Sequence, residues 1–296
     1  MRTIRIGTRG SALALAQTRM VLKEMEVRHP GYGYEIFVIK TCGDELADLP
    51  LDAIGGKGVF VKDIEEQLLS SKIDFAVHSL KDMQANLADG LTIGACLERG
   101  SHRDMIFTQH NESLESLPRG STVGTSSMRR RCQIRAFRPD LAVVDIRGNV
   151  PTRLNKVGAE VDAVILAEAG VNRLGLPPGI AIDPSLMIPS PGQGIIAVEC
   201  RNDDRELVEL GTSLDHPPTH LCAEAERAFL RTLGLDCRLP AGAYAHLQEG
   251  LIIIEGMLAT SDEKTVEKLV LKGDTPEVGS LLAEKLKEQV RRAGEV

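Results

Sequence analysis

The most informative side chains of this chain are basic and polar groups that follow its predicted strands. In an open parallel sheet, ligands bind beyond the carboxyl ends of the strands, so groups at those positions gather at one edge. Arginine binds carboxylates and phosphates through paired hydrogen bonds, and helix N-termini also favour anions. A lone arginine, or even the run at 129–131, would be taken as a solvated helix face, but the whole set favours a small ligand with several carboxylates. The set comprises Arg9, Ser11, Ser79, Lys81, Asp82, Thr125, Ser127, Arg129, Arg130, Arg131, Arg147 and Arg153.

Two single residues could take part in the chemistry itself. Asp82 is the only acid in the segment HSLKD at 78–82, where neighbouring cations favour its ionised form, and it could stabilise a cationic intermediate or move a proton. Spacing alone favours a Lys–Asp surface pair or a helix cap instead. Cys237 lies in the loop GLDCRLP at 234–240, where Arg238 would favour the thiolate. A buried packing cysteine is the more common case.

Metal and nucleotide sites are not predicted. His216 and His220 are four residues apart, but Pro217 and Pro218 break the helical face that an H-x-x-x-H site needs. The glycines within 7–10 and 55–58 fit neither a dinucleotide fingerprint nor a P-loop.

Composition and charge limit the class of partner. The formal net charge is −7, aromatic residues make up 3% and there is no Trp, which disfavours nucleic acid binding. The six cysteines form no C-x-x-C pair, so a reducing compartment is expected. The first residues lack the apolar core of a signal peptide, and no stretch is apolar enough to span a membrane. We therefore expect a cytoplasmic protein.

Hydrophobic periodicity predicts two lobes of the β-α-β-α-β type. The first lobe has predicted strands at 3–8, 35–41 and 74–78, with helices from about residue 11 and over 60–68. The second has predicted strands at 121–125, 141–146 and 162–166, with a helix start at 126–127 and a short helix over 152–157. In the first helix, the pattern places Leu15, Thr18, Leu22 and Met25 on one face.

The remaining elements predict a third, smaller domain of the α+β type. A hinge-like SPGQG at 190–194 precedes a strand at 195–199 that is predicted to return to the first lobe. Beyond residue 215 the pattern indicates a helix over 219–233, strands near Tyr244 and at 251–255, and a helix over 275–292. The expected class is α/β with three domains. Their predicted bounds are 1–97 with 195–212 for lobe 1, 98–194 for lobe 2 and 215–296 for the C-terminal domain.

Eight segments, in order across nearly the whole chain, together resemble the hydroxymethylbilane synthase family, also called porphobilinogen deaminase. None of them would suffice alone. They are IGTRGSALALAQT at 6–18, GGKGVFVKDIE at 55–65, AVHSLKD at 76–82, VGTSSMRRRCQI at 123–134, RGNVPTRL at 147–154, ILAEAGVNRLGL at 165–176, PGQGIIAVECR at 191–201 and LDCRLPAGAYA at 235–245.

This resemblance implies a transferase of tetrapyrrole, porphyrin and heme biosynthesis. Such an enzyme joins four porphobilinogens head to tail onto a covalent dipyrromethane primer, with loss of ammonia, and releases the linear tetrapyrrole hydroxymethylbilane. The implied fold has two lobes like those of type II periplasmic binding proteins and a small α+β domain that carries the cofactor cysteine. The implied partner is the substrate porphobilinogen, with no nucleic acid, no membrane and a monomeric state. The alternative is a non-catalytic bilobal anion-binding protein, against which the third domain, the Cys237 loop and the lack of a signal peptide count.

The resemblance also assigns roles to residues. Cys237 matches the position that carries dipyrromethane through a thioether. Asp82 matches the key acid, which contacts pyrrole N–H groups and stabilises an azafulvenium-like cation, and Arg9 and Arg147 match residues that assist chain growth. The matched cofactor-binding residues are Ser11, Lys57, Lys81, Asp82, Ser127, Arg129, Arg130 and Arg147. The matched substrate-binding residues are Arg9, Ser11, Arg147, Arg153 and Arg173.

Three short stretches depart from the family pattern. Met83-Gln84-Ala85 stands where V-P-T is usual, and residues 100–104 replace a more usual Pro-Arg-Asp ending. Asp236 stands where Gly is common, and its carboxylate could raise the pKa of Cys237 and slow attachment. None of these changes removes a catalytic group.

Overall fold

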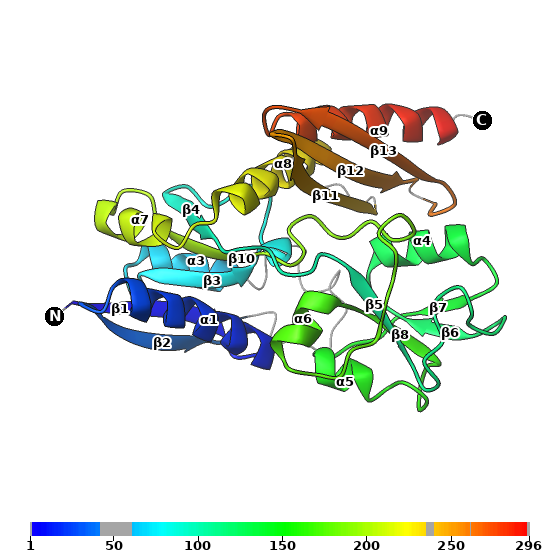
Figure 1. The fold of residues 1–296 in the computed structure, drawn as a ribbon, viewed down its shortest axis with the longest axis horizontal. Helices are drawn as coiled ribbons and strands as arrows, with labels where there is room; N and C mark the ends of the chain where they lie inside the picture. Colours follow the sequence, from blue (N-terminus) through cyan, green and yellow to red (C-terminus); the bar gives the residue numbers. More distant parts are fainter. Residues whose placement is uncertain (1, 42–60, 235–239, 261, 295–296) are drawn as a thin grey trace. The chain divides into compact units, whose positions relative to one another are not determined.

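The computed structural model describes residues 2–41, 61–234, 240–260 and 262–294. The chain divides into two compact units, Met1–Gly100 with Ile195–His220 and Ser101–Gly194 with Leu221–Val296, which we call unit 1 and unit 2. Figure 1 shows the helices and strands of both units.

Unit 1 is built on a five-stranded sheet in the order β2-β1-β3-β10-β4. Strand β1 runs parallel to β2 and β3, whereas β10, which arrives from much later in the chain, runs antiparallel to β3 and β4. Its strands are β1 (Thr3–Arg9), β2 (Gly33–Ile39), β3 (Phe75–Ser79), β4 (Leu91–Cys96) and β10 (Ile196–Arg201). Its helices are α1 (Ala12–Arg28), α3 (Lys62–Leu69), the 3₁₀ turn η2 (Leu80–Asp82) and α7 (Arg205–Thr212).

Strand β3 separates the two hydrophobic clusters of unit 1. Successive strand residues point to opposite faces. Phe75 and Val77 therefore join one cluster, which includes Val21 of α1. Ala76 joins the other cluster, which includes Ile64 of α3. Both faces of the sheet are thus covered by apolar side chains.

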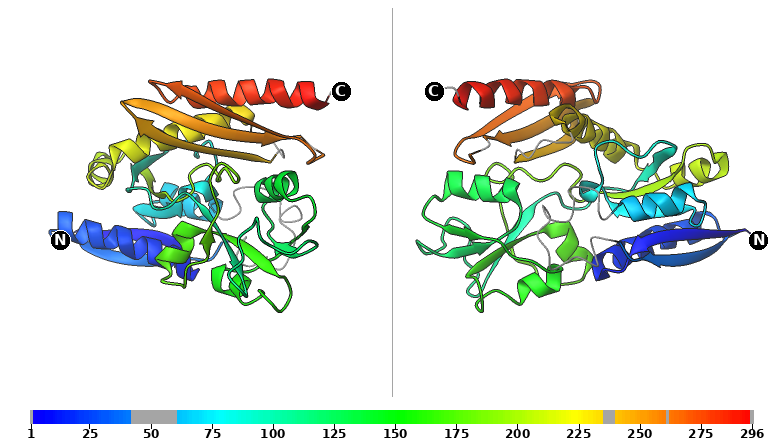
Figure 2. Two further views of the ribbon diagram at one scale, coloured as in Figure 1. Left: turned by 45° about the vertical axis from the view of Figure 1, so that its right-hand side comes forward. Right: turned by 180° about the vertical axis from the view of Figure 1, so that it is seen from behind.

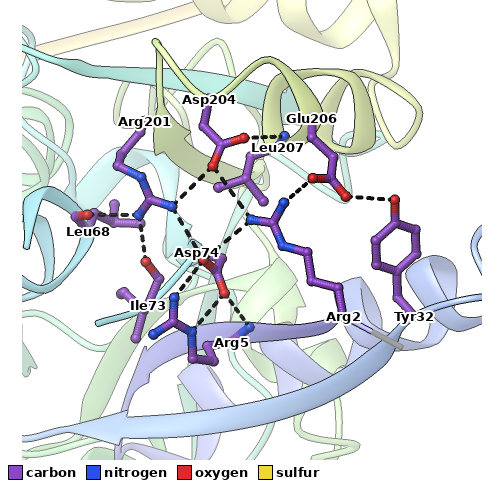
Figure 3. A network of polar contacts seen from close by, with 10 residues as sticks. All are labelled: Arg2, Arg5, Tyr32, Leu68, Ile73, Asp74, Arg201, Asp204, Glu206 and Leu207. Carbon is purple, nitrogen blue, oxygen red and sulfur yellow. Dashed lines mark hydrogen bonds and ion pairs between the residues drawn. The ribbon is translucent and has the colours of Figure 1, made fainter. Parts of the chain in front are cut away.

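The start of β3 is held by a network of ion pairs around Asp74 (Figure 3). The buried Asp74 carboxylate accepts from Arg5 at 2.9 Å through both Nε and Nη2, and from Arg201 Nη2 at 3.3 Å. Arg201 also donates to the carbonyl of Ile73 at 2.8 Å. This network connects β1, β3 and β10 near the start of β3. The carboxyl ends of β1 and β3 lie at the opposite end of these strands.

Unit 2 contains a second five-stranded sheet, in the order β7-β6-β8-β5-β9. The plan repeats that of unit 1, because β6 runs parallel to β7 and β8 while β5 runs antiparallel to β8. Its strands are β5 (Asp104–Thr108), β6 (Thr122–Gly124), β7 (Ala142–Val144), β8 (Ala163–Ala167) and β9 (Ile180–Ala181). Its helices are α4 (Met128–Phe137), α5 (Val150–Leu154) and α6 (Glu168–Arg173).

The C-terminal part of unit 2 is a small antiparallel sheet covered by two helices (Figure 2). The strands are β11 (Ala241–Gln248), β12 (Leu251–Ala259) and β13 (Val266–Gly273), and the helices are α8 (Pro217–Leu233), which starts in unit 1, and α9 (Val278–Gly294). Phe229 of α8, Ile252 and Ile254 of β12, and Leu282 and Leu286 of α9 form one buried cluster. This region therefore has a core of its own.

The expected α/β class is confirmed: the chain has two lobes, each built on a five-stranded sheet with helices, and a small α+β region at its C-terminal part. The domain bounds given above stay a prediction. The pattern did not reveal β4, β5, β9, β13, α6 or α7, and the predicted face of the first helix was partly wrong. Helix α1 buries Gln17, Thr18, Val21 and Met25, while Leu15 and Leu22 are only partly buried. Among the described residues, no helix combines the length and apolar character needed to cross a membrane.

Candidate active site

In unit 1, the predicted site residues lie at the carboxyl ends of β1 and β3. These strands are parallel neighbours, so Arg9, which ends β1, and Ser79, which ends β3, belong to the same edge of the sheet. Ser11 is the N-cap of α1, and its Oγ accepts from the backbone N–H of Ala14 at 3.2 Å. That bond uses the oxygen as an acceptor, so the hydroxyl proton can still be donated to an anion.

Asp82 is an exposed carboxylate on a firmly held segment. The Leu80 N–H donates to the Ile195 carbonyl at 3.0 Å, and the Met83 N–H donates to the Leu80 carbonyl at 3.1 Å. Leu80 and Met83 are buried, which leaves Asp82 between two anchored positions. Within the described part of the chain, Asp82 has neither an ion pair nor a hydrogen bond, so the simpler roles of a Lys–Asp pair or a cap are not seen.

The side chain of Gln17 supports the same segment from α1. Its amide Nε2 lies 2.8 Å from the Ser79 hydroxyl oxygen, and its Oε1 lies 3.1 Å from that oxygen. Sequence reasoning missed Gln17, because a glutamine on an amphipathic helix is usually solvated. Its position in the run SALALAQT, six residues after the N-cap Ser11, gave no signal of burial.

In unit 2, Arg129 and Arg130 are buried and share one carboxylate. Arg129 Nη2 donates to Asp104 Oδ2 at 2.8 Å, and Arg130 Nη2 donates to Asp104 Oδ1 at 2.7 Å. Their Nη1 groups donate to the carbonyls of Ile188 and Ile165 at 2.7 and 2.8 Å. The solvated helix face that is usual for a charge run is therefore wrong for these two residues, which are each 6% exposed.

The electrostatics of this trio leave an excess positive charge. Burial acts to raise the pKa of Asp104, but the charges of Arg129 and Arg130 outweigh it and hold that pKa well below its usual range. One carboxylate thus balances only one of two guanidinium groups. Arg130 Nε is also buried, and it has no hydrogen-bond partner among the residues that the structure describes. An anion near Arg130 would neutralise the excess positive charge and would accept a hydrogen bond from Arg130 Nε.

Arg153 lies close enough to Arg130 and Arg147 for their positive charges to act on it. Asn149 caps α5 by accepting from the Thr152 N–H at 3.0 Å, and Arg153 Nε donates to the Gly148 carbonyl at 2.7 Å. Burial, and then the positive charges of Arg130 and Arg147, lower the pKa of Arg153. Over the described ranges, neither Arg147 nor Arg153 forms an ion pair with a carboxylate. Like charges gathered without counter-ions are typical of an anion site.

Arg173 lies apart from this group, at the end of α6. Its Nη2 donates to the Gly194 carbonyl at 2.6 Å, and burial lowers its pKa to about 10. In the described part of the chain, Arg173 also lacks a carboxylate partner. Ser127, another predicted residue, caps α4 by accepting from the Arg130 N–H at 3.4 Å.

Some predicted residues cannot be placed. Cys237, Asp236 and Lys57 lie outside the described residues. His216 accepts from the Thr219 N–H at 3.3 Å and His220 lies 2.8 Å from Asp215, as expected of a linker and a helix start. The described ranges hold no group of three His, Cys, Asp or Glu side chains placed to bind a metal.

Sequence reasoning missed two buried carboxylates that organise unit 2. Asp104 was noted only as part of a departure from the family pattern. Glu226 of α8 accepts from the N–H groups of Gly192 at 2.5 Å and Ala245 at 2.7 Å, which ties α8, β11 and the SPGQG stretch together. A charged residue inside the apolar helix pattern at 219–233 was the one signal that could have revealed Glu226.

Comparison with known proteins identifies close relatives. Residues 4–209 match the family described as porphobilinogen deaminase, dipyrromethane cofactor binding domain, and residues 220–288 match the porphobilinogen deaminase C-terminal domain. The porphobilinogen deaminase of Roseiflexus sp. (strain RS-1) is 45% identical over 98% of both chains. That of Syntrophobacter fumaroxidans is 48% identical over 88% of this chain and 85% of the relative. Among solved structures, the methionine-binding protein MetQ is 14% identical, with a TM-score of 0.46 over 72% of this chain and 89% of that chain.

Proposed function

This chain belongs to the porphobilinogen deaminase family of enzymes, and we propose that it builds hydroxymethylbilane from four porphobilinogens with the residues described above. In each cycle, the C–N bond of a porphobilinogen aminomethyl group breaks and a C–C bond to the growing chain forms. The protonated amine of the aminomethyl group leaves as ammonia and the attacked pyrrole carbon loses one proton, so atoms and charge balance. The reaction therefore needs a stabilised cation, a route for the proton and a holder for a growing set of carboxylates.

Asp82 is proposed as the catalytic carboxylate. Loss of ammonia from the aminomethyl carbon leaves positive charge on the pyrrole, and a fixed anion lowers the energy of that state. Asp82 suits this role because its backbone is anchored on both sides while its carboxylate is exposed and without a protein partner in the described chain. The same oxygens can accept hydrogen bonds from pyrrole N–H groups.

The cations are proposed as holders of acetate and propionate side chains. Arg153 suits carboxylates because the charges of Arg130 and Arg147 act on it, and neither Arg147 nor Arg153 has an acidic partner in the described ranges. Arg9 and Ser11 lie at a strand end and a helix N-terminus. Arg9 and Arg147 are further proposed to assist chain growth. Arg173 is proposed as a substrate ligand because burial lowers its pKa and no acid of the described residues offsets that cost.

The dipyrromethane cofactor fits the residues present. Its carboxylates match the excess positive charge of Arg129 and Arg130 over Asp104 and the unpartnered Nε of Arg130. Ser11, Lys57, Lys81, Asp82, Ser127, Arg129, Arg130 and Arg147 are proposed to hold it, with Cys237 as the covalent anchor. When bound, the cofactor supplies the pyrrole carbon to which the first substrate is joined.

The alternative of a non-catalytic anion-binding protein is not favoured. The match extends through the C-terminal domain, which a bilobal binding protein has no need of. We further propose that the enzyme is a cytoplasmic monomer. It is also proposed to have no nucleic acid partner, because its net charge is −7 and it has few aromatic residues.

The observation that carries this proposal is the firmly held Asp82 carboxylate, which has no partner among the residues that the structure describes, in a chain of this family. Purified enzyme incubated with porphobilinogen should release one ammonia for each porphobilinogen consumed and yield a linear tetrapyrrole by mass spectrometry. Binding of porphobilinogen without release of ammonia would favour the anion-binding alternative.

A further inference from the structure

Three buried titratable side chains lie together in unit 1, and one of them directly precedes the Asp82 segment. They are Glu65 of α3, His78 of β3 and Glu199 of β10. His78 Nε2 lies 3.1 Å from Glu199 Oε2. The strand register explains the pair: His78 is opposite Ala197, and Glu199 lies two residues further along β10, on the same face of the sheet.

The two side chains are within hydrogen-bond distance, and which of the two atoms donates is set by the tautomer of His78. Helix α3 covers the same face and brings Glu65 close enough for its charge to act on the pair. Burial, and then the charge of Glu199, raise the pKa of Glu65.

Stability alone does not account for this cluster. Glu199 is fully buried, and within the described residues its Oε1 has no hydrogen-bond partner. Burying a carboxylate with one oxygen unsatisfied costs free energy, and apolar residues of similar size would stabilise the same place better. The feature that the pair does supply is a fixed connection between β3 and β10.

That connection lies at the end of β3 where the Asp82 segment begins. Beyond the His78–Ala197 pair, Ser79 is opposite Ile196, and the Leu80 N–H donates to the Ile195 carbonyl at 3.0 Å. Strand β10 is therefore the support on which η2 rests. At the other end of the same two strands, Arg201 and Asp74 form the corresponding connection, with Nη2 and Oδ1 3.3 Å apart (Figure 3).

We propose that His78 and Glu199 are positioning residues: their hydrogen bond locks the end of β3 to β10 and so holds the Asp82 carboxylate in place for the reaction. The proposal rests on the proposed role of Asp82. Small displacements of a catalytic group reduce the rate of the chemical step, and a shift of about 1 Å can cost about 100-fold. Loss of the pair therefore lowers kcat, while KM, which reflects carboxylate binding elsewhere, stays nearly constant.

The test compares the two ends of the strands in the holoenzyme. Glu199→Ala and His78→Ala should each lower kcat by about 10- to 100-fold with KM within about 3-fold, and the double variant should be no slower than either single variant. Glu199→Gln, whose side-chain amide keeps both an acceptor and a donor at this position, should recover most of the rate. Arg201→Gln is the matched control: it weakens the same two strands at the far end, and its kcat should stay within about 3-fold of the unaltered enzyme.

Two results would contradict the role of the His78–Glu199 pair. Unchanged kcat in folded Glu199→Ala and His78→Ala, or an equal loss in Arg201→Gln at the same loss of stability, overturns the proposal. If Glu199→Ala does not fold, Glu199→Asp replaces it, because it withdraws the carboxylate by one methylene and should also slow kcat. Asp82→Ala is assayed in parallel: full activity there removes the proposed role of Asp82, whereas an inactive Asp82→Ala beside active His78 variants removes only this inference.

Discussion

Arg130 donates from Nη2 to Asp104 Oδ1 at 2.7 Å, while its buried Nε meets no acceptor in the described part of the chain. Arg130 thus contributes to the fold through Nη2, while its Nε can donate a hydrogen bond to a ligand. Asp104 fixes the guanidinium planes of Arg129 and Arg130 through one oxygen each. Fixed planes are what a bidentate interaction with a ligand carboxylate requires.

Removal of Asp104 should severely destabilise unit 2. Asp104→Ala leaves two buried guanidinium groups without their counter-ion, so the free energy of unfolding should fall by about 3–5 kcal/mol. Urea denaturation followed by circular dichroism measures this change. Asp145→Asn, which removes the exposed partner of Arg131, is the control and should change the free energy by at most about 0.5 kcal/mol. Similar small effects of both substitutions would refute the structural role given to Asp104.

The network around Asp74 should make stability depend on acid pH. Burial acts to raise the pKa of Asp74, but hydrogen bonds from Arg5 and the charge of Arg5 outweigh it and lower that pKa. A lowered folded-state pKa means that the stabilisation is present above the unfolded value, about 3.9, and is lost as the pH falls through the folded value.

Asp74→Asn isolates this contribution. The difference in unfolding free energy between the unaltered protein and Asp74→Asn should be largest near neutral pH and should shrink as the pH falls below about 4. Urea midpoints measured at a series of pH values give this difference directly. A difference that stays constant from pH 7 to the acid limit of folding would show that Asp74 does not titrate in this way.

Asp82 should matter for turnover far more than for folding or binding. Asp82→Ala should lower kcat by about 100- to 1,000-fold, because the lost contribution is electrostatic stabilisation of a cation. Its midpoint of urea denaturation should stay close to that of the unaltered enzyme, since Asp82 is exposed. Asp89→Ala, which removes another exposed acid seven residues further along, is the control for a general change of charge. Near-normal turnover of Asp82→Ala would exclude Asp82 from the chemistry.

Arg153 should show opposite effects on binding and on stability. Arg153→Gln should raise KM about 10-fold or more, because hydrogen bonds between charged groups contribute about 1.5–3 kcal/mol. The free energy of unfolding should not fall, because burial and the charges of Arg130 and Arg147 oppose the charged form of Arg153 in the fold. Arg119→Gln removes an exposed arginine of the same unit and should leave KM unchanged. A lower free energy of unfolding in Arg153→Gln, with KM unaltered, would show that Arg153 has a structural role and does not bind substrate.

The sequence allowed the strands around the site to be predicted because their signals are local. Runs such as DFAVH and DAVIL are apolar, short and bounded by charged or turn residues, and both became buried strands. Strands β4 and β5 were missed because LTIGAC and DMIFT contain no sustained alternation of apolar and polar residues. Their identity is set by pairing with β10 and β8, which are distant in sequence.

The set of site residues was predictable by type and by position after strands, but their partners were not. Nothing in the run Arg129–Arg131 shows that the first two residues are buried against Asp104 while the third pairs with the exposed Asp145. Gln17 likewise replaces the expected Leu15 in the buried face of α1, because the hydroxyl of Ser79 at the end of β3 supplies its hydrogen bond. Such choices depend on tertiary partners and not on helical period.

The most direct test of the account is the intact mass of the protein made in cells that supply porphobilinogen. The unaltered chain should be heavier than its sequence by two joined pyrrole units, and Cys237→Ser should have the mass of the bare sequence, with Cys222→Ser still carrying the adduct. A fully folded, unmodified wild-type chain, or an adduct that persists in Cys237→Ser, would contradict the account.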